Sequence, residues 1–486
     1  MMRGRTAAAP RGIPDAVPAQ ARPVARRRVP VASGDRAASP FFTFALALYA
    51  SVTVARLHEV VPLLSHFYLG KVAVLILIAA FVKESSSIPF SQAFATRTAK
   101  CIGAMTVVGV LSVPTSYWPG QSVGFLRDTW PLIALLGIGL LVGMDNRVTA
   151  QRTIASVLIV AIIGAGELVV GAGAQQIAVA GNTVSAVVSE RAYIAGGGSS
   201  TYDSNYSAAF FVMMIPYALM FAGRKGWMRW VGIFGVPILG MAMIKTGSRG
   251  GIVAMIVLAV CIIAFADKKT RPKQILILAV CVAAMLALPH NDLTQRIRAL
   301  ITGEDYNFDA KGGRWEVWSN GMQMLIMRPF LGVGMHAFPV ADFSLGSGFM
   351  DAHNSYVQVA AELGIPGIVA FVMMIAAAFK SVWGMRRSSG AIVRSGQPNE
   401  QAAFDLALST AALCALIAEL TAAAFLSLGY EAMTMFALTV PIGLTLTRSR
   451  GASALVAAAR NGAVRLRGMK PRGRPASPPQ RPAPTS

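Results

Sequence analysis

Apolar runs of about 15–25 residues recur along the whole chain, and no other feature constrains its fold as strongly. A run of this length crosses the hydrocarbon core of a bilayer as a helix. The runs lie at 41–56, 71–82, 101–113, 130–143, 153–171, 205–222, 231–244, 251–266, 275–288, 355–379, 402–420 and 424–446, and two of them are short. They predict an all-α fold, a polytopic bundle of about 12 membrane spans with both termini on the same side.

The composition excludes an ordinary water-soluble domain. Hydrophobic residues make up 55% of the chain and charged residues 14%, whereas a soluble domain carries about 25% charged residues. The four cysteines fall within predicted spans and have no metal-ligand spacing. We therefore expect them to be small buried hydrophobic residues.

The net charge of +22 suggests a nucleic-acid partner at first sight, but its distribution indicates a membrane instead. If the amino terminus is cytoplasmic, 33 of the 44 basic residues fall in cytoplasmic segments, against only 7 of the 22 acidic residues. This is the asymmetry of the positive-inside rule. We expect no nucleic-acid binding, and we expect the basic tails to contact anionic membrane lipids.

Three parts are predicted along the chain. Residues 1–40 form a basic, disordered cytoplasmic tail, residues 41–447 form the membrane domain, and residues 448–486 form a basic, Pro-rich cytoplasmic tail. The domain has two long outer loops, at 172–204 and 289–353, and such loops on a compact body usually carry function. In the second loop, short helices are predicted at 293–301 and 314–327, the latter with Trp315, Trp318, Met322 and Leu325 on one face.

The segment HNSYVQVAAELGIPG, from His353 to Gly367, begins where the second loop becomes a membrane helix. A histidine at the outer mouth of a span suits a general base, because its reference pKa lies near neutrality. From spacing alone, a hydrogen-bonded interfacial histidine is the simpler explanation of His353. Gly364 and Gly367 indicate a kink or a close helix contact. His336, another histidine of this loop, has apolar neighbours and ranks below His353.

Several arginines accompany His353 on the outer side. The turn KTGSRGG places Arg249 at a helix start, where it forms either an anion site or a hairpin turn with a snorkelling arginine. Four more lie in the two long loops: Arg191, Arg296, Arg298 and Arg314. The outer segments are otherwise slightly negative, so these arginines are not part of a general basic coat. Arginine forks match a pyrophosphate group in charge and geometry.

The motifs resemble those of the O-antigen ligase and O-antigen polymerase superfamily. The resemblance rests on H-N-x9-G-x-x-G at His353–Gly367 and on TGSRGG, GGRWEVW and RPFLGVG upstream of it, and it covers roughly residues 191–367. The stretches VARLHEVVPLL and SVPTSYWPG are similar to members from exopolysaccharide clusters.

The resemblance implies a metal-independent, inverting glycosyltransferase without a cofactor, with periplasmic outer loops, in the bacterial inner membrane. The donor would be a glycan on undecaprenyl pyrophosphate, and the acceptor would be lipid A–core or another lipid-linked glycan. Carried over to this chain, His353 matches the essential histidine, Arg249 and Arg191 match arginines that hold the pyrophosphate, and Arg296 in RIRAL resembles a loop element. Arg314 and Asn354 complete the expected substrate-binding set.

Two alternatives stay open. A protein O-oligosaccharyltransferase would use the same residues with a protein hydroxyl as acceptor. A transporter would place charged groups at mid-membrane and often shows inverted repeats. Glu167, Glu362 and Glu419 are the intramembrane carboxylates, but the chain shows no internal repeat, and the other candidate residues gather at one surface.

Overall fold

The computed structural model describes residues 39–85, 90–170, 204–266, 271–272, 275, 313–395 and 399–446. Within these ranges the chain is helical and has no strand, which confirms the predicted all-α class. Nearly all of both predicted tails, the first long loop, the predicted span at 275–288, the predicted helix at 293–301 and the second loop up to residue 312 lie outside the described residues.

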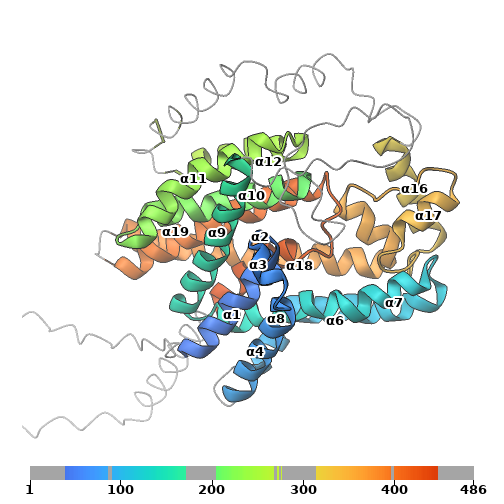
Figure 1. Ribbon diagram of the computed structural model, residues 1–486, viewed down its shortest axis with the longest axis horizontal. Helices are drawn as coiled ribbons and strands as arrows, with labels where there is room; N and C mark the ends of the chain where they lie inside the picture. The colour runs from blue at the N-terminus through green and yellow to red at the C-terminus, as the bar shows by residue number, and fades with distance from the viewer. Residues whose placement is uncertain are drawn as a thin grey trace, which may run out of the picture. The chain divides into compact units, whose positions relative to one another are not determined.

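The helices follow one another in the order shown in Figure 1. They are α1 (Pro40–Thr53), α2 (Leu57–Val60), α3 (Pro62–Ser65), α4 (Leu69–Lys83), α5 (Phe90–Ala95), α6 (Arg97–Ser112), the 3-10 turn η1 (Val113–Thr115), α7 (Pro119–Asp128), α8 (Trp130–Gly143), α9 (Arg147–Val170), α10 (Ser204–Ala222), α11 (Trp227–Lys245), α12 (Arg249–Phe265), α16 (Arg314–Met327), α17 (Phe338–Ser344), α18 (Ser355–Arg394) and α19 (Glu400–Ala423). A last apolar helix spans Ala432–Leu446.

Seven helical stretches of the described part are long and apolar enough to cross a membrane. They are Arg97–Thr115, Pro119–Gly143, Arg147–Val170, Ser204–Ala222, Trp227–Lys245, Ser355–Arg394 and Glu400–Ala423. Shorter apolar helices are Pro40–Thr53, Arg249–Phe265 and Ala432–Leu446. Each apolar run predicted within the described residues overlaps a helix. The chain is a membrane protein, and the count of about 12 spans stays a prediction.

Helix α10 is largely buried and contacts α9, α11, α12 and α19. Glycines let α11 approach it closely: a Cβ at Gly232 would lie 2.2 Å from the backbone nitrogen of Ala222. Small residues allow such close packing of membrane helices, whose association gains little from the hydrophobic effect within lipid. Helix α1 is joined to α9 through the hydroxyls of Thr43 and Thr149, which are 2.8 Å apart.

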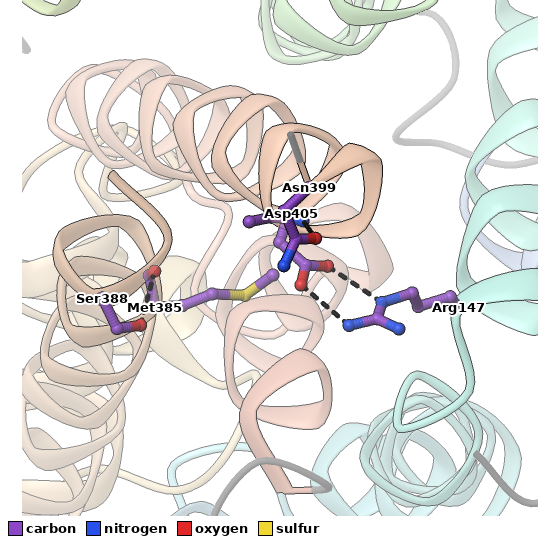
Figure 2. A network of polar contacts seen from close by, with 6 residues as sticks. Arg147, Met385, Ser388, Asn399 and Asp405 are labelled. Carbon is purple, nitrogen blue, oxygen red and sulfur yellow. Dashed lines mark hydrogen bonds and ion pairs between the residues drawn. The ribbon is translucent and has the colours of Figure 1, made fainter. Parts of the chain in front are cut away.

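An ion pair joins the starts of α9 and α19 (Figure 2). The Arg147 guanidinium donates through Nε and Nη2 to the two carboxylate oxygens of Asp405, over 3.1 and 2.9 Å. The Asp405 side chain is only 5% exposed and the Arg147 side chain 31%. Because Arg147 is the first residue of α9 and Asp405 lies near the start of α19, the two helices begin at the same end of the bundle.

Helix α16 packs on α18 with a face other than the one that carries Trp315 and Met322. Its buried residues are Val317, Asn320, Gly321 and Met324. A Cβ at Gly321 would lie 2.3 Å from Val357 Cγ1, so the contact with α18 needs this glycine. Trp315 and Met322, on the predicted apolar face, are exposed. The periodicity did not identify the packing face because that face contains a glycine and a buried asparagine.

Two further findings concern α18 and the last predicted run. The helix breaks at Gly364, whose φ of 64° and ψ of −164° are not helical. This confirms the predicted kink. The run predicted at 424–446 is wrong in its first third, because residues 424–431 form turns and the helix begins only at Ala432.

Candidate functional site

His353 lies in the turn that leads into α18, with its backbone in the left-handed region at a φ of 46°. Its backbone N–H donates to Ser427 Oγ over 3.0 Å. The carbonyl of the preceding residue, Ala352, accepts a hydrogen bond of 3.0 Å from the Trp318 indole of α16. The side chain of His353 is half-buried. Two distant parts of the chain, α16 and the stretch around Ser427, therefore hold this histidine at the helix start.

Asn354 is the N-cap of α18. Its Oδ1 accepts the backbone N–H groups of Tyr356 and Val357, over 3.0 and 3.2 Å. Asparagine is among the preferred residues at this position because it satisfies amides that have no helical partner. The cap of α18 is thus Asn354. A role of Asn354 in binding substrate stays a proposal.

The segment 424–431 is tied to the start of α18 by the buried hydroxyl of Ser355. This hydroxyl donates to the Leu426 carbonyl over 2.7 Å and accepts the Leu428 N–H over 2.7 Å. The same segment contacts the start of α12, since a Cβ at Gly250 would lie 3.1 Å from Phe425 Cβ. One non-helical segment thus lies between the starts of α12 and α18.

Arg249 is the first residue of α12, as the sequence predicts, and its side chain is half-buried. Ser248 caps the helix, accepting the Gly251 N–H over 3.1 Å. Gly251 lies against α10, where a Cβ would come within 2.7 Å of the Ala208 Cβ. The first turn of a helix offers backbone N–H groups and a partial positive charge, so this position favours an anion.

Arg314 is the first residue of α16 and is half-buried. It lies one helical turn before Trp318, on the same side of the helix, and Trp318 bonds to the turn that contains His353. The structure therefore brings Arg249, Arg314 and His353 to one end of the bundle. Arg191, Arg296 and Arg298 lie outside the described residues.

The loop between α16 and α17 is fastened to α18 by the carboxylate of Glu362. Its two oxygens accept the backbone N–H groups of His336 and Phe338, each over 3.0 Å. The Glu362 carbonyl accepts the Gly334 N–H over 3.1 Å. Glu362 is fully buried, and these bonds give it a structural role. The sequence identified it only as an intramembrane carboxylate.

His336 has an aromatic and a polar partner, although its sequence neighbours are apolar. Its φ is 62°, its ring stacks on Phe125 with centroids 4.7 Å apart, and its Nδ1 lies 3.3 Å from Gln121 Nε2. Burial lowers the pKa of His336, and the nearby Asp351 carboxylate opposes this shift. The imidazole is therefore neutral at pH 7.

The sequence patterns did not identify two charged residues that lie near the site. Arg56, just before α2, has a φ of 56° and pairs with Glu59, with Nε 2.7 Å from Oε2. Glu431 ends the segment 424–431, and burial raises its pKa while Arg56 lowers it and Asp351 raises it further. The available signals were the Arg and Glu three residues apart in VARLHEVV and the SLGYE interruption of an apolar run.

Three residues described above, Arg56, His336 and His353, have left-handed backbone. In the described part, the non-glycine residues with positive φ are Arg56, Tyr68, His336 and His353. The Asp351 carboxylate interacts electrostatically with His336 and with Glu431, and Glu431 interacts with Arg56. Strained backbone of this kind gathers at active sites and ligand clamps, where the surrounding structure holds it in place.

Residues 234–372, which include Arg249, Arg314 and His353, match the family model described as O-antigen ligase. This stretch of the chain is similar to the O-antigen ligase family. A comparison with curated proteins gives no match. The match confirms the resemblance drawn from the motifs, and it supports glycan transfer of the ligase or polymerase type, which requires a lipid-linked glycan donor and an acceptor.

The stretch that matches the O-antigen ligase family runs from within α11 to within α18. Arg56, α7 and the segment 424–431 lie outside the matched residues yet contact or interact with this end of it. The matched stretch is therefore contacted by parts of the chain on both sides of it.

Proposed function

We propose that this protein transfers a glycan from an undecaprenyl-pyrophosphate donor to an acceptor lipid or glycan at the periplasmic face of the bacterial inner membrane, in O-antigen or exopolysaccharide synthesis. The observation that carries the proposal is that the segment 424–431 contacts both the start of α12, beside Arg249, and the backbone of His353. An anion-binding helix start and a candidate base, both within the stretch similar to the O-antigen ligase family, thus adjoin one short segment.

The proposed reaction is a single displacement with inversion at the anomeric carbon. The acceptor hydroxyl oxygen forms a bond to that carbon, and the bond from the carbon to the pyrophosphate oxygen breaks. The hydroxyl proton moves to the His353 imidazole. The lipid pyrophosphate leaves as a stabilised anion, so the leaving group needs no acid.

Arg249 and Arg314 neutralise the charge that grows on the pyrophosphate oxygens as the bond breaks. Arginine suits this position because its planar fork holds two phosphate oxygens and stays charged. Gly250 of α12 faces Phe425. Because Gly250 has no side chain, the start of α12 lies close to the segment 424–431. Arg191 and Arg296 belong to the same proposal on the ground of resemblance alone.

The test is the variant His353→Ala in the source bacterium, with surface polysaccharide and lipid-linked glycan both measured. We expect the transfer rate to fall by about 10²- to 10⁴-fold, the usual contribution of a general base, with accumulation of the lipid-linked donor. The exposed His66 provides the matched control His66→Ala, and both variants are checked for membrane insertion. Unchanged product and donor in His353→Ala would contradict the proposal and favour the transporter alternative.

The chain length of the product separates the two forms of the reaction. If the protein is a polymerase, the inactive variant would leave single repeat units on the acceptor. If it is a ligase, the inactive variant would leave full-length polymer on the lipid donor. Glycan missing from a protein instead of from a lipid would indicate the protein O-oligosaccharyltransferase.

A further inference from the structure

Two exposed aromatic side chains lie against each other close to His353. Trp118, just before α7, is 39% exposed, and Phe349, four residues before His353, is 58% exposed. Their ring centroids are 5.9 Å apart, and the rings meet edge to face. Neither residue belongs to the candidate catalytic set, and Trp118 lies outside the O-antigen ligase match.

Two further residues of α7 lie in line with Trp118, and both contact His336. Gln121, one turn after Trp118, approaches His336 Nδ1, and Phe125, one further turn along, stacks on the His336 ring. Trp118, Gln121 and Phe125 therefore share one side of α7, at the spacing that helix geometry requires. That side faces the two loops that carry His336 and Phe349.

Hydrogen bonds hold this side of α7 and the loop that carries His336 in place. The backbone N–H of His336 bonds to the buried Glu362 carboxylate, and Ser122 donates to the Met335 carbonyl over 2.7 Å. The Tyr117 N–H donates to the Val333 carbonyl over 2.9 Å, which joins the start of α7 to the same loop. The positions of Trp118 and His336 are thus fixed before any ligand arrives, which reduces the ordering cost of binding.

The mixture of groups fits a sugar ring and not a lipid tail. A pyranose has apolar C–H faces, which stack on aromatic rings, and a rim of hydroxyl groups, which need donors and acceptors. Trp118 and Phe349 supply the rings, whereas Gln121 and the neutral His336 supply hydrogen-bonding groups. Asp351, exposed and two residues from His353, adds an acceptor between this surface and the histidine.

We propose that Trp118, Gln121, His336 and Phe349 form a subsite that binds a pyranose ring of the transferred or accepting glycan beside His353. The inference rests on the proposed glycan transfer and adds to it the place where a sugar is bound. Trp118 comes from the start of α7 and Phe349 from the segment before α18, so two distant parts of the chain build the subsite.

The test compares two matched aromatic pairs in full-length protein in native membranes. The subsite variants are Trp118→Ala and Phe349→Ala. The control variants are Trp230→Ala and Phe234→Ala, a pair with centroids 6.0 Å apart and both rings 58% exposed, at the end of α11 opposite Arg249. The probes are lipid-linked glycan extracted from cells of the source bacterium and the extracted acceptor lipid.

We expect each subsite variant to raise KM for one of the two probes by about ten-fold, the effect of losing one aromatic stacking contact, with kcat changed less than two-fold. Trp118→Phe, which keeps a ring, is expected to stay within about three-fold of the parent. A rise in KM for the extracted donor assigns the sugar to the donor, and a rise for the acceptor lipid assigns it to the acceptor.

The proposal is overturned if neither KM changes in the subsite variants, or if the control variants raise KM equally. These outcomes differ from failure of the proposed function, in which the parent protein transfers no glycan or His353→Ala transfers it normally. Amounts of each variant in the membrane fraction are measured alongside, and Trp118→Phe keeps the proposal testable if Trp118→Ala does not accumulate.

Discussion

The backbone N–H of His353 and the hydroxyl of Ser427 form a 3.0 Å hydrogen bond that joins the start of α18 to the segment 424–431. The bond satisfies a backbone donor in a left-handed residue, a conformation that costs about 1–2 kcal/mol outside glycine. Ser427 therefore helps to hold the histidine in a position it would not adopt by itself.

Replacement of Ser427 by alanine tests this relationship. We expect Ser427→Ala to slow glycan transfer by about five-fold, because a hydrogen bond of about 1 kcal/mol no longer fixes the histidine. Transfer rate is measured in membranes containing equal amounts of protein. Ser427→Thr, which keeps the hydroxyl, should retain most of the activity, and a normal rate in Ser427→Ala would show that the bond does not position His353.

Gly332 is expected to tolerate no side chain. Its φ is 66°, and a Cβ there would lie 2.3 Å from the carbonyl carbon and oxygen of Glu362. Gly332→Ala should separate the loop from α18 and strongly reduce folded protein in the membrane. Gly346→Ala is the matched control, because Gly346 also has a positive φ, 91°, but nothing lies within 4 Å. The control should cost only the backbone strain of about 1–2 kcal/mol, and equal losses in both variants would refute the steric argument.

The Arg147–Asp405 pair should couple α9 to α19. Removing one partner leaves the other charge largely buried without its counter-charge, which lowers the free energy of unfolding by about 3 kcal/mol. Thermal unfolding of purified protein is expected to show a lower Tm for Arg147→Ala and for Asp405→Ala. The double variant should lose less than the sum of the two. Strictly additive losses would indicate that the ion pair contributes nothing beyond its separate side chains.

Acid should destabilise the protein partly through His336. Because burial lowers the pKa of His336 in the folded state, the unfolded chain binds the proton more readily, and stability is lost as pH falls below about 6.5. The Asp351 carboxylate limits the shift, and Glu362 bonds only to the backbone of His336. Tm measured from pH 8 to pH 5 should fall less steeply in His336→Gln. Identical slopes would exclude His336 as a source of the acid sensitivity.

Local signals were sufficient where the site is built from one stretch of chain. A serine followed by Arg249 and two glycines, and a histidine followed by Asn354, both mark helix starts, and the structure places helix starts at both. Caps and turns are decided within a few residues, so a sequence pattern captures them. The kink at Gly364 was predictable for the same reason.

Residues 424–431 were missed because distant contacts decide their conformation. Leu426 and Leu428 keep the segment apolar, so its hydropathy continues into the helix that follows. Its carbonyl and N–H groups are instead satisfied by the Ser355 hydroxyl from another helix. The same holds for His336, whose backbone partner, Glu362, is supplied by α18. Tertiary hydrogen bonds of this kind leave no periodic trace.

The break at Gly364 divides α18 into two rigid pieces that meet at one residue. A long membrane helix changes its tilt when the surrounding bilayer becomes thicker or thinner. The short piece that begins at Ser355 is held instead by its bonds to the segment 424–431 and to the loop before α17. His353 is thus attached to a platform whose geometry does not depend on lipid thickness, so membranes of different composition should leave the geometry around His353 unchanged.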